Sequence, residues 1–169
     1  MRFFYVLLIL LVFNSLHAQE FEQSLGNDDN VDMVLVTKDM FNLITEIDAE
    51  NKNELKDFYG SLEYLATYSA DRSPAANKIY DEALAYVRSK NMRLLTKIKD
   101  QNKTAEFYYL PAARKGYAKE LVLVIRYANG HTSLMQVKGN INMRKISLLA
   151  LQATMLDASL LKKAEQSVQ

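Results

Sequence analysis

Cysteine is absent from the 169 residues of this chain. Its absence excludes disulfide bonds, thiolate metal sites and a cysteine nucleophile. It also excludes the lipid-bearing cysteine that anchors a bacterial lipoprotein after its signal segment. Thiol chemistry and a lipid anchor are therefore removed from the functions to be considered.

Histidine and glycine are scarce, with two histidines and five isolated glycines. No Gly-x-x-x-x-Gly-Lys run is present to hold a phosphate. The sequence contains neither an Asp-x-Asx-x-Asx-Gly loop nor a Glu-x-x-His pair, which would point to a metal. His131 lies in a predicted hairpin turn, and no Gly-x-Ser-x-Gly elbow accompanies it. The sequence therefore predicts no metal, no cofactor and no catalytic residue.

Neither sign of charge dominates, since 21 lysines and arginines face 20 acidic residues. Arg2 is the only charged residue among the first eighteen, so the rest of the chain carries 20 charges of each sign. A near-neutral chain has no overall field to draw it onto nucleic acid or anionic lipid. We therefore expect no nucleic-acid partner.

An unbroken apolar run, Phe3 to Phe13, follows Arg2 at the N-terminus. A basic start, a short apolar core and a small residue before the cleavage point are typical of an export signal, here ending at Ala18 before Gln19. An uncleaved membrane anchor is the alternative, although the run is shorter than the roughly 20 residues that span a bilayer. No later stretch approaches that length. We predict an exported chain, periplasmic or extracellular, that is soluble after cleavage.

Composition divides the chain into three segments: a signal peptide at 1–18, a flexible acidic lead at 19–30 and a single α+β domain at 31–165 that ends in a long helix. The lead is polar, and its only large apolar residues are Phe21 and Leu25, which are too few to order it. The 151 residues that remain after cleavage are enough for one domain with a sizeable core.

Hydrophobic periodicity predicts the elements of this domain. Strands are expected at 31–36, 62–69, 93–99, 106–110, 119–127 and 133–138. Helices are expected at 40–47, 55–59, 74–90 and from 142 onward. The strand at 119–127 has apolar residues on both faces, which is typical of a central, doubly covered strand. This order predicts an α+β fold in which helices pack on one face of a mixed, mostly antiparallel sheet.

Aromatic and basic residues gather around 111–117, the longest connection between the predicted strands. Binding surfaces favour tyrosine and arginine, because large rigid side chains lose little entropy when a partner buries them. The predicted binding residues are Tyr108, Arg114, Lys115, Tyr117 and Lys119. The alternative is that Phe107 and Tyr109 point into the core while Tyr108 covers the sheet edge.

The predicted last helix carries apolar side chains beyond those that a compact sheet must cover. They are Met155, Leu156, Leu160 and Leu161. An apolar stripe of this kind is either core or an interface. Both alternatives stay open, and the second implies self-association of the chain into a homo-oligomer.

Three short motifs stand beside the signal that ends in Ala-Gln: Val36-Thr37-Lys38-Asp39-Met40-Phe41, Glu120-Leu121-Val122 and Val137-Lys138-Gly139-Asn140-Ile141-Asn142-Met143. With these motifs the chain resembles a family of small exported bacterial proteins, the domain of unknown function 4252. The family's closing motif often reads Gly-x-Ile-Asp-Leu, and Asn142 and Met143 occupy its last two places here. The resemblance implies an exported α+β domain of an outer-membrane bacterium, with no established activity and no catalytic residues to carry over.

These observations favour a non-enzymatic binding module of the bacterial envelope, whose partner is an envelope protein or a small ligand. The first alternative is a small hydrolase with a carboxylate-based site, since paired acids leave no local sequence signature. The second is a self-associating structural protein. Two acids in one concave pocket would favour the hydrolase, and an exposed apolar stripe on the last helix would favour the structural protein.

Overall fold

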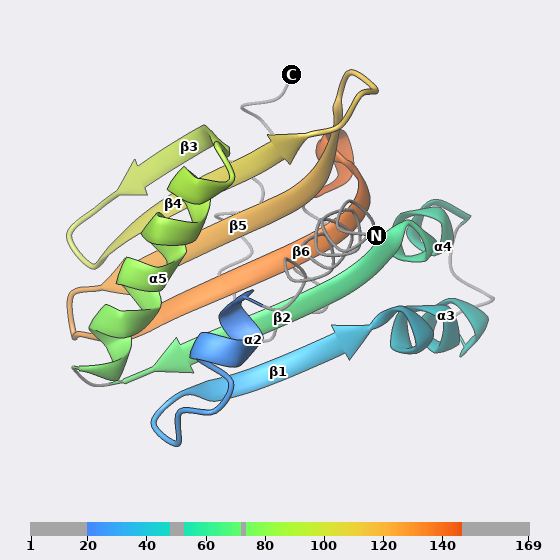
Figure 1. Ribbon diagram of the computed structural model, residues 1–169. Coiled ribbons are helices and arrows are strands. Elements are labelled where there is room, and N and C mark those ends of the chain that lie inside the picture. Colours follow the sequence, from blue (N-terminus) through green and yellow to red (C-terminus); the bar gives the residue numbers. More distant parts are fainter. Residues whose placement is uncertain (1–19, 48–52, 72–73, 147–169) are drawn as a thin grey trace, which may run out of the picture.

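The computed structural model describes residues 20–47, 53–71 and 74–146 (Figure 1). The strands are β1 (Asp32–Thr37), β2 (Leu62–Ala70), β3 (Arg93–Lys99), β4 (Lys103–Pro111), β5 (Tyr117–Tyr127) and β6 (Thr132–Asn142). The helices are α2 (Glu20–Ser24), α3 (Lys38–Ile47), α4 (Asn53–Gly60) and α5 (Ala75–Ser89). The six strands form one sheet in the order β1-β2-β6-β5-β4-β3, and every neighbouring pair is antiparallel. The predicted α+β class is confirmed.

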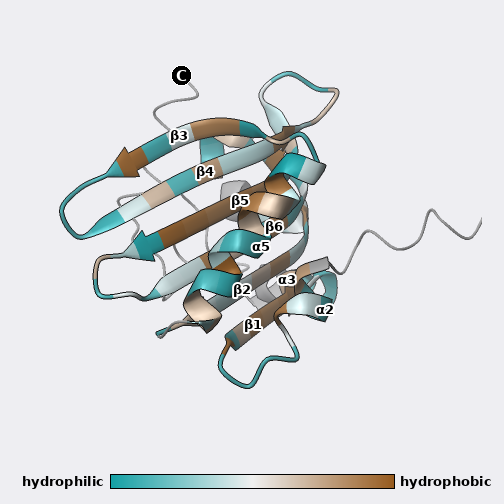
Figure 2. Cartoon of the chain, turned by 60° about the vertical axis from the view of Figure 1, so that its left-hand side comes forward, coloured by the Kyte–Doolittle hydropathy of each residue, from teal (hydrophilic) through white to brown (hydrophobic). Residues whose placement is uncertain are grey.

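Strand β5 lies in the interior of the sheet, between β4 and β6. Its residues 121–125 are all buried, because alternate side chains enter two different hydrophobic clusters. Leu121 and Leu123 face one cluster, and Val122 and Val124 face the other. Figure 2 shows this apolar stretch in brown. The prediction of a doubly covered strand is confirmed.

Helical side chains reach both faces of the sheet. Helices α5 and α2 lie in front of it in Figure 1, and Ile79 and Ala83 of α5 pack in the cluster of Val122. Phe41 of α3 and Phe58 of α4 belong to the cluster on the opposite face. The sequence predicted helices on one face, and the structure adds helical cover to the other because both faces of β5 are apolar.

A buried polar network fixes α5 on the sheet. The Tyr86 hydroxyl donates a hydrogen bond to Glu120 Oε1 at 2.7 Å, and Gln136 Nε2 donates to the Tyr86 oxygen at 3.1 Å and to the same carboxylate. All three side chains are buried. Because an unpaired buried carboxylate destabilises a fold strongly, these bonds specify how α5 sits over β5 and β6.

The structure corrects the predicted flexible lead over residues 20–30. Helix α2 buries Phe21 and Leu25, whose exposed fractions are 2% and 0%. The Phe21 ring centroid lies 4.5 Å from that of Tyr86 on α5 and 6.1 Å from that of Tyr68 on β2. Two large apolar side chains suffice here because they join a hydrophobic cluster built mainly by α5 and the sheet, so the segment needs no core of its own.

A 3₁₀ turn at residues 143–146 follows β6. The side-chain oxygen of Asn142 accepts a hydrogen bond from the backbone N–H of Arg144 at 3.1 Å, so Asn142 caps this turn. The predicted cleavage site at Ala18 and Gln19 lies outside the described residues, as do the predicted interface residues Met155, Leu156, Leu160 and Leu161. Within the described ranges, no helix has the length and apolarity to cross a membrane.

Candidate functional site

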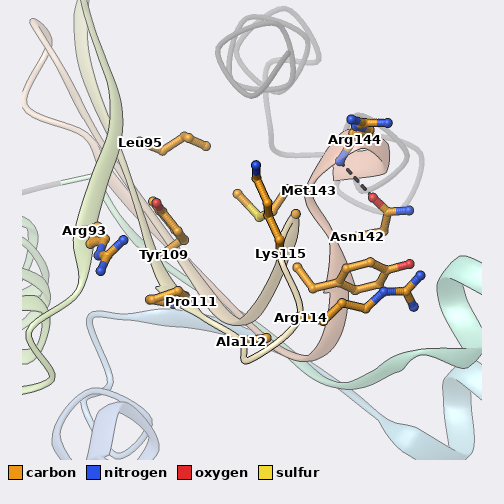
Figure 3. A pocket seen from close by; sticks show the side chains of 12 residues that line it. Arg93, Leu95, Tyr109, Pro111, Ala112, Arg114, Lys115, Asn142, Met143 and Arg144 are labelled. Carbon is orange, nitrogen blue, oxygen red and sulfur yellow. Dashed lines mark hydrogen bonds between the residues drawn. The ribbon is translucent and has the colours of Figure 1, made fainter.

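A hollow of about 820 Å³ opens at one end of the sheet, where β3 begins, β4 ends, β5 begins and β6 ends (Figure 3). Antiparallel pairing brings these four strand ends together, although the residues span positions 93 to 144 of the sequence. The described lining residues are Arg93, Leu95, Tyr109, Pro111, Ala112, Arg114, Lys115, Gly116, Tyr117, Asn142, Met143 and Arg144.

The floor of the hollow is apolar because it is the margin of a hydrophobic cluster. Leu95 and Tyr109 are partly buried and pack against that cluster, and Met143 belongs to it with 3% of its surface exposed. Pro111 adds a further apolar surface at the end of β4. An apolar floor next to polar groups is the usual composition of a small-molecule pocket.

The rim is basic. Arg93, Arg114, Lys115 and Arg144 are exposed and line the hollow, and the described lining residues include no acidic side chain and no histidine. Figure 3 shows Arg93 on one side and Arg114 on the other, with Lys115 between them. Guanidinium groups bind carboxylate and phosphate with two parallel hydrogen bonds, so the rim suits an anion.

Backbone hydrogen bonds hold the loop between β4 and β5, one within the loop and one from the turn after β6. The backbone N–H of Ala112 donates to the Tyr117 carbonyl at 3.0 Å, and the Met143 N–H donates to the Gly116 carbonyl at 3.0 Å. The Arg114 guanidinium carbon lies 4.2 Å from the centroid of the Tyr117 ring, a cation–π contact that stabilises this position of the group. The basic groups are thus carried on an anchored loop.

Three of the five predicted binding residues line the hollow, namely Arg114, Lys115 and Tyr117. Tyr108 does not, because its side chain faces the other side of the sheet, where its hydroxyl donates to Glu106 Oε2 at 3.2 Å. Burial, followed by the nearby Glu106 charge, raises the pKa of Tyr108 to about 12. Lys119 is exposed beside a register shift between β5 and β6 and is not among the described lining residues.

Sequence reasoning missed Arg93, Tyr109 and Arg144. Arg93 and Tyr109 are direct partners across β3 and β4, and Arg144 reaches the hollow from the turn after β6. A hairpin could have paired Arg93 with Tyr109, because β3 and β4 are consecutive strands joined by the short turn at 100–102. No such local signal links Arg144 to them.

The described lining of the hollow is cationic, aromatic and apolar, without a carboxylate. A carboxylate-based hydrolase needs two acids near the bond that is cleaved, and the described lining residues hold none. The described residues also contain no group of three or more histidines and acids that could hold a metal ion. The arrangement is suited to hold an anion against an apolar surface.

The fold and the hollow define a small α+β domain, with one antiparallel sheet and a basic pocket at the strand ends. The chain belongs to the family called domain of unknown function 4252, whose model matches residues 21–149. The resemblance predicted from the sequence motifs is confirmed. No curated protein and no solved structure matches the chain significantly.

Proposed function

We propose that this protein is an exported binding module of the bacterial envelope, and that it holds a small amphiphilic anion in the hollow at the ends of β3 to β6. The observation that carries the proposal is the basic rim of Arg93, Arg114, Lys115 and Arg144 around an apolar floor, with no acidic side chain among the described lining residues.

Local charge supports an anionic ligand. The whole chain is close to neutral, so four cations around one hollow are a local concentration rather than the expression of a basic protein. Like charges repel, and the repulsion is relieved when an anion enters. The carboxylate or phosphate group of the ligand would be held by the arginines.

The floor and the volume support a small ligand with an apolar part. Leu95, Pro111 and Met143 offer a surface that an alkyl or aromatic group would cover. The volume of about 820 Å³ lies within the range of roughly 300 to 1,000 Å³ that is usual for small-molecule pockets. The export signal expected at residues 1–18 places such a ligand in the envelope or outside the cell.

The proposal is tested by calorimetric titration of the chain from Gln19 onward with decyl phosphate and with inorganic phosphate. We expect decyl phosphate to bind more tightly than inorganic phosphate, because it adds contacts with the floor. An Arg114→Ala/Lys115→Ala variant should lose about tenfold or more in affinity, since it removes two charge-assisted contacts. The matched control is Lys119→Ala, which removes an exposed cation that is near in sequence and does not line the hollow.

If the double variant and the native chain bind decyl phosphate with equal affinity, the hollow is not the binding site. If neither phosphate binds, but the chain captures an envelope protein and the capture needs Arg114, the small-ligand proposal is wrong and the partner is a protein. Raised salt should weaken binding in the native chain, because exposed charges are screened within roughly 10 Å at 0.1 M.

A further inference from the structure

A second polar cluster lies at the opposite end of the sheet, where β2 ends and the β5–β6 hairpin turns. His131 Nδ1 is 2.7 Å from Asp71 Oδ1, and His131 Nε2 is 2.7 Å from Ser133 Oγ. Asp71 is 60 positions from His131 in the sequence and is brought there by the pairing of Ala70 with Thr132. None of the three residues lines the basic hollow.

The hairpin turn positions the imidazole. The backbone N–H of His131 donates to Asn129 Oδ1 at 3.0 Å, and the His131 carbonyl accepts from the Tyr127 N–H at 2.9 Å. The Tyr127 and His131 ring centroids are 5.2 Å apart. Backbone, ring face and both ring nitrogens are therefore all in contact with neighbours, which limits rotation of the side chain.

The order carboxylate, Nδ1, Nε2, hydroxyl is that of the serine hydrolases. A carboxylate beside Nδ1 keeps the proton on that nitrogen, so Nε2 faces the hydroxyl with its lone pair. We propose that Ser133 is a nucleophile activated by His131, and that it takes the acyl group of small activated esters. The proposal is independent of ligand binding in the basic hollow.

The reaction has two balanced steps. Ser133 Oγ attacks the ester carbonyl while its proton moves to His131 Nε2, and the alcohol leaves with that proton as the acyl–serine ester forms. Water then attacks the acyl carbon, its proton moving to Nε2 and on to Ser133 Oγ, and the carboxylic acid is released. No oxidant, metal or cofactor enters either step.

The burial of Ser133 limits the size of the substrate, and the exposure of Asp71 affects how much each residue contributes to the rate. Ser133 is 8% exposed, between Ser69 and Ile125 of the neighbouring strands, so we expect reagents with short chains to react faster than reagents with long chains. The Asp71 side chain is 82% exposed. Water competes for its carboxylate, and we expect loss of Asp71 to slow the reaction less than loss of His131.

Labelling with an alkyl fluorophosphonate tests the proposal. Ser133 Oγ would displace fluoride from phosphorus, and intact-mass and fragment spectra would identify the modified residue. Native chain from Gln19 is compared with Ser133→Ala, His131→Gln and Asp71→Asn. The matched control is Ser69→Ala, which removes the serine paired with Ser133 on β2.

We expect the label on Ser133, no label in Ser133→Ala, and a rate reduced by roughly a hundredfold or more in His131→Gln. Asp71→Asn should lose less, and Ser69→Ala should react like the native chain. An unlabelled native chain, a label on another residue, or an unchanged rate in His131→Gln would overturn the proposal. If Ser133→Ala does not fold, the labelled site in the native chain and the His131→Gln rate still decide it.

Discussion

Gly139 shows how one residue of this fold is constrained by its neighbours. Its φ is +147°, and a Cβ placed on it would lie 2.4 Å from the Ser61 carbonyl oxygen and 2.9 Å from the Leu62 Cα. The sequence predicted a strand at 133–138, which ends just before this glycine. In the structure β6 continues to Asn142, and the glycine is required because the β2 backbone approaches closely at a register shift.

We predict that Gly139→Ala lowers the free energy of unfolding by about 2 to 4 kcal/mol, because backbone strain adds to steric overlap with the β2 backbone. Urea denaturation of the native and variant chains measures the change. Gly130→Ala is the control, since its φ is +91° but a Cβ there would meet nothing within 4 Å. It should lose only about 1 to 2 kcal/mol. Equal losses for the two variants would contradict a steric cause at Gly139.

At the scale of elements, α2 and the turn that follows it are attached to α5 in two ways. Phe21 and Leu25 pack in the cluster of α5, and Lys78 Nζ of α5 donates to Asp28 Oδ2 at 2.9 Å. The Lys78 hydrogen bond, followed by those from the backbone and side chain of Asn30, lowers the pKa of Asp28 from 3.8 to about 2. The turn is therefore held electrostatically as well as by apolar packing.

The lowered pKa of Asp28 makes its contribution to the stability of the fold depend on pH. Because the folded pKa of Asp28 lies below its unfolded value, the contact stabilises the fold fully above pH 4 or so and is lost as the pH falls toward about 2. We predict a carboxyl titration midpoint of about 2 by NMR. Lys78→Ala should raise the midpoint toward 3.8, although not fully, since the Asn30 donors remain. Lys56→Ala, an exposed lysine on α4, should leave it unchanged. An ordinary midpoint in the native chain would disprove the contact in solution.

Across the whole molecule, a balanced number of charges is distributed unevenly. The chain has 21 basic and 20 acidic residues, yet the hollow at one end of the sheet is lined by four cations and no described acid. Local recognition rather than a global field would therefore bring a ligand to this protein. If the chain is exported, the ligands available to it are those of the envelope or the cell exterior.

We predict that a Gram-negative host exports the chain and cleaves it after Ala18, because a small residue suits the signal peptidase pocket. Mass spectrometry of the envelope fraction should find a product that begins at Gln19. Ala18→Arg should leave the signal attached, whereas Glu20→Gln should be cleaved normally. A native product that retains Met1 to Ala18 would contradict the prediction.

The family, the α+β class and most strand positions could be inferred from the sequence, because hydrophobic alternation and capping depend on residues a few positions apart. Strand β3 was predicted at its observed bounds, and the apolar run of β5 already indicated an interior strand. Tertiary structure alone decided the order of the strands. It packed α2 against α5 and β2, brought Arg93 and Arg144 to one hollow, and placed Asp71 beside His131. These contacts join residues far apart in the sequence, such as Phe21 with Tyr86 and Asp71 with His131, and they arise from the packing of complete elements, which no local pattern encodes.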